Sequence, residues 1–229
     1  PYRRQRQMCI RDRDKSDITV VEGVMGYYDG QGFSTKGSSY EIADITDTPV
    51  ILIVNCRGMS NSIGAVVKGY LGYEKNNNIK GVIFNNLSDR LYGNAARIVK
   101  DMGIEPLGYM PYKKNAVLES RHLGLVTSAE VEHFQEKINS IAEQMRESID
   151  IERILRIAEN ASKLEAIHKS IDKKDVRIAV AKDEAFCFLY DDNIDYLRQC
   201  GCEIVYFSPL ADNKLPDNID GLLLYGGYP

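Results

Sequence analysis

Short apolar runs rich in β-branched residues alternate with segments of helical periodicity along most of this 229-residue chain. The run Val50–Asn55 (VILIVN) is apolar up to its last residue, which is typical of a parallel strand buried on both faces. Ser60–Tyr73 follows with apolar residues at helical spacing. Because strands that alternate with helices indicate βαβ units, the sequence predicts an α/β protein with a doubly wound parallel sheet.

The remaining elements are predicted from the same two periodicities. We expect further strands at Ile18–Glu22, Gly81–Asn85, Pro106–Met110, Val176–Ala181, Glu203–Phe207 and Gly221–Tyr225. We expect further helices at Tyr40–Thr46, Leu91–Met102, Ser128–Met145, Ile151–Leu164 and Phe188–Cys200. Ser128 and Asp150 are the expected N-caps of the two helices that follow each other without a strand between them.

The change of pattern divides the chain into segments. Residues 14–165 form the first predicted domain, residues 166–175 a charged linker, and residues 176–229 the beginning of a second βα domain. Residues 1–13 (PYRRQRQMCIRDR) are basic and lack strand or helix periodicity, so we expect them to be non-native or disordered.

Charge and cysteine content narrow the classes of function. The net charge of −4 and a pI of about 5.5 argue against a nucleic-acid partner, because such proteins usually carry a basic face. No apolar run approaches the roughly 18 to 20 residues that span a bilayer. Five cysteines without a disulfide framework fit a reducing cytoplasm, and Cys200 and Cys202, with no histidine nearby, make a poor zinc site.

Two acidic residues frame a glycine-rich stretch, VVEGVMGYYDG, from Val20 to Gly30. Glu22 ends a predicted strand and Asp29 lies in the loop that follows. Ligands of open α/β sheets bind beyond the carboxyl ends of the strands, and two carboxylates there suit an Mg²⁺ ion shared with phosphates. The alternative is a glycine-rich turn with two solvated acids.

The whole string EGVMGYYDG resembles the signature of the cobyrinate a,c-diamide synthase family. The segments PVILIVNCRGMSNSIGAVVKGY, GVIFNN and LGYMPYKKNAVLESRHLGLV resemble the family's next elements, so the resemblance covers nearly the whole chain. It implies that residues 14–165 are part of a P-loop domain of the dethiobiotin-synthetase-like kind. ATP would be the co-substrate and Mg²⁺ the cofactor.

The resemblance also implies roles for individual residues. Glu22 and Asp29 would be metal-binding and catalytic, while Asn85 and Pro111 would line the adenine pocket. Arg121 and His122 would face either the nucleotide phosphates or the carboxylates of a corrinoid. The alternatives are a turn-capping role for Asn85, a strand terminator at Pro111, and a loop anchored by Arg121 and His122.

The segments VRIAVAKDEAFCFLYDDNIDYL and EIVYFSPLADNKLPDNIDGLLLYGGYP resemble the opening of a class I glutamine amidotransferase domain. Gly226 and Gly227 match the turn whose N–H groups stabilise the oxyanion formed during glutamine hydrolysis. Lys182, Asp183 and Phe186 have either a substrate-facing or domain-interface role, or they form a helix start whose acidic residues favour its dipole. Cys187 lies too early in the domain to be the nucleophile.

No phosphate-binding string of the form G-x-x-x-x-G-K-[ST] is present, and we expect the glutaminase nucleophile to lie beyond Pro229. We therefore expect an incomplete fragment that is inactive alone. The resemblance implies an intact cytoplasmic ligase, compatible with a homodimer, that uses ATP to form an acyl phosphate on cobyrinic acid. Ammonia from glutamine would then amidate its c and a carboxylates.

Two other functions remain open on the sequence alone. A nickel-sirohydrochlorin a,c-diamide synthase shares most of these strings. A non-catalytic binding module that keeps both folds is the rival of a different class.

Overall fold

The computed structural model describes residues 16–23, 25–114, 133–163 and 175–227. The chain forms two compact units, residues 1–165 and 166–229, and each is considered by itself. None of the helices within the described ranges is long and apolar enough to cross a membrane.

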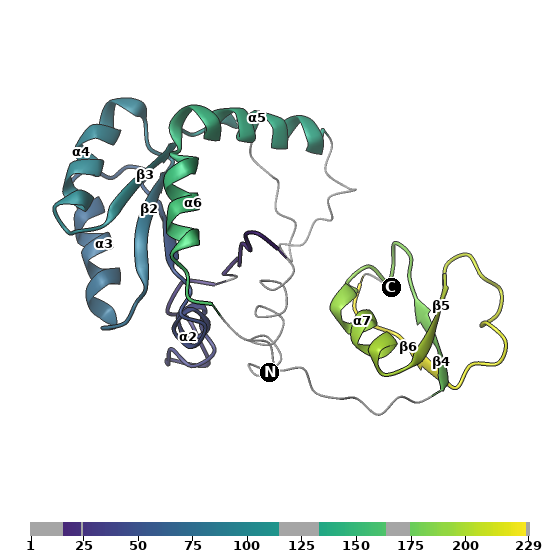
Figure 1. The fold of residues 1–229 in the computed structure, drawn as a ribbon. Helices are drawn as coiled ribbons and strands as arrows, with labels where there is room; N and C mark the ends of the chain where they lie inside the picture. Colours follow the sequence, from purple (N-terminus) through teal and green to yellow (C-terminus); the bar gives the residue numbers. More distant parts are fainter. Residues whose placement is uncertain (1–15, 24, 115–132, 164–174, 228–229) are drawn as a thin grey trace. The chain divides into compact units, whose positions relative to one another are not determined.

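The first unit is built on a parallel sheet with the strand order β1-β2-β3. Its strands are β1 (Val50–Asn55), β2 (Ile79–Asn85) and β3 (Glu105–Met110). Its helices are α2 (Ser39–Ile45), α3 (Ser62–Tyr73), α4 (Asp89–Lys100), α5 (Phe134–Ser148) and α6 (Ile151–Glu159). Helices α3 and α4 lie on one side of the sheet and α6 lies on the other, as a doubly wound fold requires (Figure 1).

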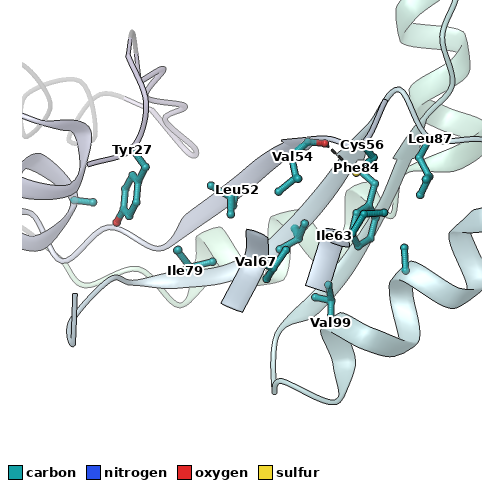
Figure 2. Close-up of a cluster of buried hydrophobic side chains, with 13 residues drawn as sticks. Tyr27, Leu52, Val54, Cys56, Ile63, Val67, Ile79, Phe84, Leu87 and Val99 are labelled. Carbon is teal, nitrogen blue, oxygen red and sulfur yellow. Dashed lines mark hydrogen bonds between the residues drawn. The ribbon is translucent and has the colours of Figure 1, made fainter. Parts of the chain in front are cut away.

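The larger core lies between the sheet and helices α3 and α4 (Figure 2). Val67, Phe84 and Val99, from α3, β2 and α4, have no exposed surface. The two helices approach closely because α3 carries Gly64, where an added Cβ would lie 2.7 Å from a methyl group of Ile98. The buried apolar residues of α3 and α4 pack in one cluster with those of the sheet, so the apolar side of each helix faces the sheet.

A smaller core covers the opposite face. Leu107 of β3 is fully buried and packs in one cluster with Ile83 and Ile149. At Gly108 the backbone has a φ of 125°, and an added Cβ would lie 2.2 Å from the Ser148 carbonyl oxygen, so only glycine fits where β3 meets the end of α5. The prediction that β1 is buried on both faces is wrong, because the Ile53 side chain is 66% exposed.

Several predicted boundaries change. The structure has no strand at Ile18–Glu22: Val20 is 90% exposed, and a short apolar run forms a strand only where a neighbour completes its hydrogen bonds. Helix α6 ends at Glu159, and Asp150 caps its start as predicted, accepting a hydrogen bond from the Arg153 N–H at 2.9 Å. Ser128 lies outside the described residues, where no cap can be assigned.

The second unit contains a parallel sheet with the order β5-β4-β6. Its strands are β4 (Val176–Ala181), β5 (Cys202–Phe207) and β6 (Gly221–Leu223), and its helix is α7 (Asp191–Gln199). Helix α7 begins three residues later than predicted, because the Phe188 N–H donates to the Gly226 carbonyl oxygen at 3.0 Å instead of opening the helix. Ala179, Val180 and Ala181 of the central strand are fully buried.

Candidate functional site

The carboxyl ends of the three strands in the first unit form one polar edge. Asn55, Asn85 and Met110 occupy equivalent positions on β1, β2 and β3. Pro111 follows Met110 directly, so the structure brings the two predicted adenine-binding residues, Asn85 and Pro111, to the same edge on adjacent strands. Both residues are half-buried, which leaves part of each accessible to a ligand.

A small asparagine network orients the amides at this edge. The Asn85 Oδ1 atom accepts a hydrogen bond from the Asn86 N–H at 3.0 Å. The Asn86 side chain in turn donates to the Asn55 Oδ1 atom, also at 3.0 Å. Asn86 adopts a φ of 57°, which asparagine tolerates better than most residues. The network therefore uses the Asn85 side-chain carbonyl oxygen as an acceptor.

Asn55 and Asn86 were not among the predicted site residues. Asn55 is the last residue of β1 and Asn86 directly follows β2, and a polar residue at such a position was the signal that could have found them. Only the pairing of β1 with β2 brings their side chains together.

A cavity of about 490 Å³ lies between the glycine-rich loop and helix α3. Asp29, Tyr28 and Phe33 contribute to it from the loop, and Gly69 and Tyr73 contribute from the helix. The sequence did not single out these α3 residues, because apolar residues at helical spacing predict the buried face of a helix and give no sign of a cavity.

The loop is held in place by close backbone contacts. The Asp29 N–H donates to the Gly26 carbonyl oxygen at 2.9 Å, and an added Cβ at Gly26 would lie 2.3 Å from the Asp29 carboxylate. An added Cβ at Gly30 would lie 2.4 Å from the Lys36 carbonyl oxygen. These two glycines therefore allow the loop to pack closely on itself.

Tyrosines join the loop to the helix. The Tyr28 ring lies 4.8 Å from the Tyr73 ring and 5.8 Å from the Tyr70 ring, measured between centroids. The Tyr28 hydroxyl donates to the Tyr70 carbonyl oxygen at 2.6 Å. Burial, together with the neighbouring Tyr40 ring, raises the pKa of Tyr28 to about 12, so its hydroxyl remains a neutral donor at any pH near neutrality.

The two predicted metal ligands have different surroundings. Asp29 lines the cavity, whereas Glu22 does not contribute to its wall, and both side chains are exposed. The prediction that Glu22 stands at the carboxyl end of a strand is wrong, because residues 18–22 form no strand.

No group of three or more His, Cys, Asp or Glu residues suited to a metal occurs among the described residues. An Mg²⁺ ion commonly takes only one or two carboxylates and completes its shell with water and phosphate oxygens, so the absence of such a group among these residues has no bearing on a magnesium site.

In the second unit, the Gly226–Gly227 turn packs against the loop that follows β4. An added Cβ at Gly227 would lie 1.8 Å from the Ala185 carbonyl oxygen, so glycine is required there for packing. The Tyr225 hydroxyl donates to the Phe186 carbonyl oxygen at 3.1 Å and joins the same two segments. The second predicted site is therefore a tightly packed turn.

Asp183 organises this loop. Its carboxylate accepts hydrogen bonds at 2.9 Å from the N–H groups of Ala185 and Phe186, and others from the Leu210 N–H and the Ser208 hydroxyl. Partial desolvation raises the pKa of Asp183, but the hydrogen bonds outweigh it and leave the pKa below its ordinary value. Asp183 is a loop anchor and does not begin α7, which starts at Asp191.

Four other residues that the sequence singled out have different outcomes. The Lys182 ammonium group lies 5.0 Å from the centre of the Tyr206 ring, a cation–π distance. Cys187 is exposed within the same loop. Arg121 and His122 lie outside the described residues.

Comparison with known proteins places this geometry in a class. The model of the AAA domain family matches residues 5–120, about half of the chain, and the match begins inside the segment 1–13. The chain therefore belongs to the AAA domain family, whose nucleotide-binding fold agrees with the parallel sheet and its polar carboxyl edge. No solved structure matches the chain.

Individual relatives narrow the resemblance. A cobyrinate a,c-diamide synthase from Caldanaerobacter subterraneus subsp. tengcongensis is 34% identical over 227 residues, which cover 98% of this chain and 50% of that protein. Synthases of the same name from Clostridium tetani and Sulfurisphaera tokodaii are 39% and 40% identical over 95% and 98% of this chain. The predicted resemblance to the cobyrinate a,c-diamide synthase family is confirmed. The chain spans about half the length of these curated relatives.

Proposed function

We propose that this chain is part of an ATP-dependent, glutamine-using ligase that amidates the a and c carboxylates of cobyrinate in cobalamin biosynthesis. The support is the resemblance to synthases of that name along almost the whole chain, together with the AAA domain match. The names of these relatives do not favour the nickel-sirohydrochlorin alternative. We further propose a cytoplasmic location.

The observation that carries the nucleotide-binding part is the juxtaposition of Asn85 and Pro111 at the carboxyl edge of the sheet. In this proposal the Asn85 amide nitrogen donates to the adenine ring while Pro111 packs against its face. The Asn86 N–H fixes the direction of the Asn85 amide, so the site is organised before ATP arrives.

Asp29 and Glu22 would hold the Mg²⁺ ion together with the nucleotide phosphates. When bound, the ion would neutralise charge that develops as the terminal phosphoryl group is transferred to the carboxylate. Asp29, at the rim of the cavity, would place that ion beside the reacting carboxylate, and the loop contacts of Gly26 and Gly30 would hold Asp29 in position.

For the second unit we propose the N-terminal part of a class I glutamine amidotransferase domain, with residues 166–175 as the linker. The backbone N–H groups of the Gly226–Gly227 turn would stabilise the oxyanion formed when the glutaminase nucleophile attacks glutamine. The Asp183-anchored loop supports the turn through the Phe188 and Tyr225 hydrogen bonds.

Equilibrium binding of MgATP and MgGTP to the chain tests the nucleotide site. Asn85→Ala is expected to weaken ATP binding about tenfold, because it removes the amide donor from a half-buried edge. Asn94→Ala, on the exposed face of α4, is the matched control and is expected to bind ATP like the wild type. Equal ATP affinity in the wild type and Asn85→Ala would refute the assignment.

A further inference from the structure

One wall of the cavity is a smooth helix surface. Ala65 and Gly69 are one turn apart on α3, both are exposed, and both line the cavity. An added Cβ at Gly69 would meet nothing within 4 Å. A ligand can therefore lie directly against the helix backbone at this position, between the larger α3 residues Val66, Tyr70 and Tyr73 that also line the cavity.

The rim of the cavity is aromatic. Phe33, from the loop, is fully exposed, and Tyr73, from α3, is 66% exposed. Phe33 follows Gly32, which has a φ of 61° and open space around it. Isolated exposed apolar residues are common, but a fully exposed phenylalanine on a glycine-bearing loop at a cavity rim is positioned to cover an apolar ligand.

The carboxylate at this cavity, that of Asp29, bears on which ligand the cavity would bind. Asp29 lines the cavity together with Tyr28, whose ring stacks on Tyr70 and lies tilted against Tyr73. A ligand that suits this arrangement has a broad apolar face for the α3 wall and a carboxylate arm that would meet Asp29 through the proposed Mg²⁺ ion, since two carboxylates repel each other without a cation between them. The volume of about 490 Å³ is within the range of small-molecule sites.

We propose that this cavity binds the face of the substrate's macrocyclic ring, with Ala65 and Gly69 as its floor and Phe33 as its cover. The inference rests on the proposed function and extends it, because it assigns the corrinoid ring to α3 and the adenine ring to the separate edge at Asn85. Gly69 is then a determinant of substrate size, since any larger side chain occupies the space of the ring.

Two glycines on α3 allow a matched test. Gly69 and Gly72 are both exposed, and an added Cβ at either has open space, but only Gly69 lines the cavity. Replacing either glycine by leucine favours the helix to a similar degree, so neither change is expected to unfold α3. Far-UV circular dichroism and urea unfolding verify that both variants are folded.

The measurement is the affinity for cobyrinic acid, followed by its absorbance, and the affinity for MgATP. Gly69→Leu is expected to weaken corrinoid binding at least about tenfold while MgATP binding is unchanged. Gly72→Leu is expected to bind both like the wild type, and Phe33→Ala is expected to weaken corrinoid binding several-fold.

The outcomes separate this inference from the proposed function. Wild-type corrinoid affinity in Gly69→Leu would overturn the ring site and leave the proposed function standing. Loss of MgATP binding in Gly69→Leu would show that the cavity serves the nucleotide and would also overturn the ring site. Absence of corrinoid binding by the full-length wild-type protein would overturn both.

Discussion

Substitution of Gly227 by alanine separates the packing role of this turn from its proposed chemistry. The new Cβ would lie 1.8 Å from the Ala185 carbonyl oxygen, and real Cβ contacts are essentially never shorter than 3.0 Å, so the two segments must separate by at least 1.2 Å (3.0 − 1.8). The nearest atoms are all backbone, so no side-chain rotation relieves the clash.

The cost follows from what that separation breaks. The Phe188 N–H to Gly226 O bond at 3.0 Å and the Tyr225 hydroxyl to Phe186 O bond at 3.1 Å both join the segments that must move apart. At about 0.5 to 1.5 kcal/mol each, their loss destabilises the turn by about 1 to 3 kcal/mol, which is also the usual cost of overpacking.

Hydrogen exchange read by mass spectrometry measures this effect locally. A peptide that covers residues 183–190 is expected to exchange faster in Gly227→Ala by a factor that corresponds to about 1 to 3 kcal/mol. Gly221→Ala is the control, because its Cβ would meet its nearest neighbour, a side-chain carbon of Ile178, at an ordinary 3.9 Å. Unchanged exchange in Gly227→Ala, or equal acceleration in Gly221→Ala, would refute the packing argument.

Three further predictions address the cores, the acid stability and the cysteines. Phe84→Ala is expected to lower the free energy of unfolding by about 3 to 5 kcal/mol, measured by urea unfolding followed by tyrosine fluorescence. Ile53→Ala, at a 66% exposed position, is expected to lower it by about 1 kcal/mol or less, and equal losses would contradict the assigned core. The folded-state pKa of Asp183 lies below its ordinary value of 3.8, so the stability that Asp183 contributes is present above pH 3.8 and is lost as the pH falls through the folded-state pKa. Asp183→Asn should reduce this acid dependence in a pH series of urea unfolding, and an unchanged dependence would count against the anchor role. Burial raises the pKa of the Cys56 thiol to about 11, so alkylation at neutral pH should modify the exposed Cys187 and should spare Cys56 until urea is added. Rapid labelling of Cys56 in the native protein would contradict its burial.

Most strands and helices of both units follow from the sequence because their signals are local. The apolar run at Val50–Asn55 and the cap at Asp150 identify their elements without reference to the rest of the chain. The prediction at Ile18–Glu22 was wrong because an apolar run alone does not provide the hydrogen-bonding neighbour that makes a strand. The exposure of Ile53 likewise depends on how much of the sheet the helices cover.

The candidate site was only partly accessible to sequence reasoning. Asn85 and Pro111 were predicted from the family resemblance, and the strand register puts them at one edge. The contact between Asn86 and Asn55 and the wall at Gly69 depend on residues 31 or more positions apart in the sequence meeting in space. Such contacts are set by tertiary packing, which neither periodicity nor local motifs encode.

The central claim is that this chain belongs to an enzyme that transfers the amide nitrogen of glutamine to cobyrinate. The most direct measurement incubates the full-length protein with cobyrinic acid, MgATP and glutamine labelled at its amide nitrogen, and follows the corrinoid by mass spectrometry. The account predicts a corrinoid with two labelled amides, formed only when ATP is present. An unchanged corrinoid, or one amidated without ATP, would contradict it.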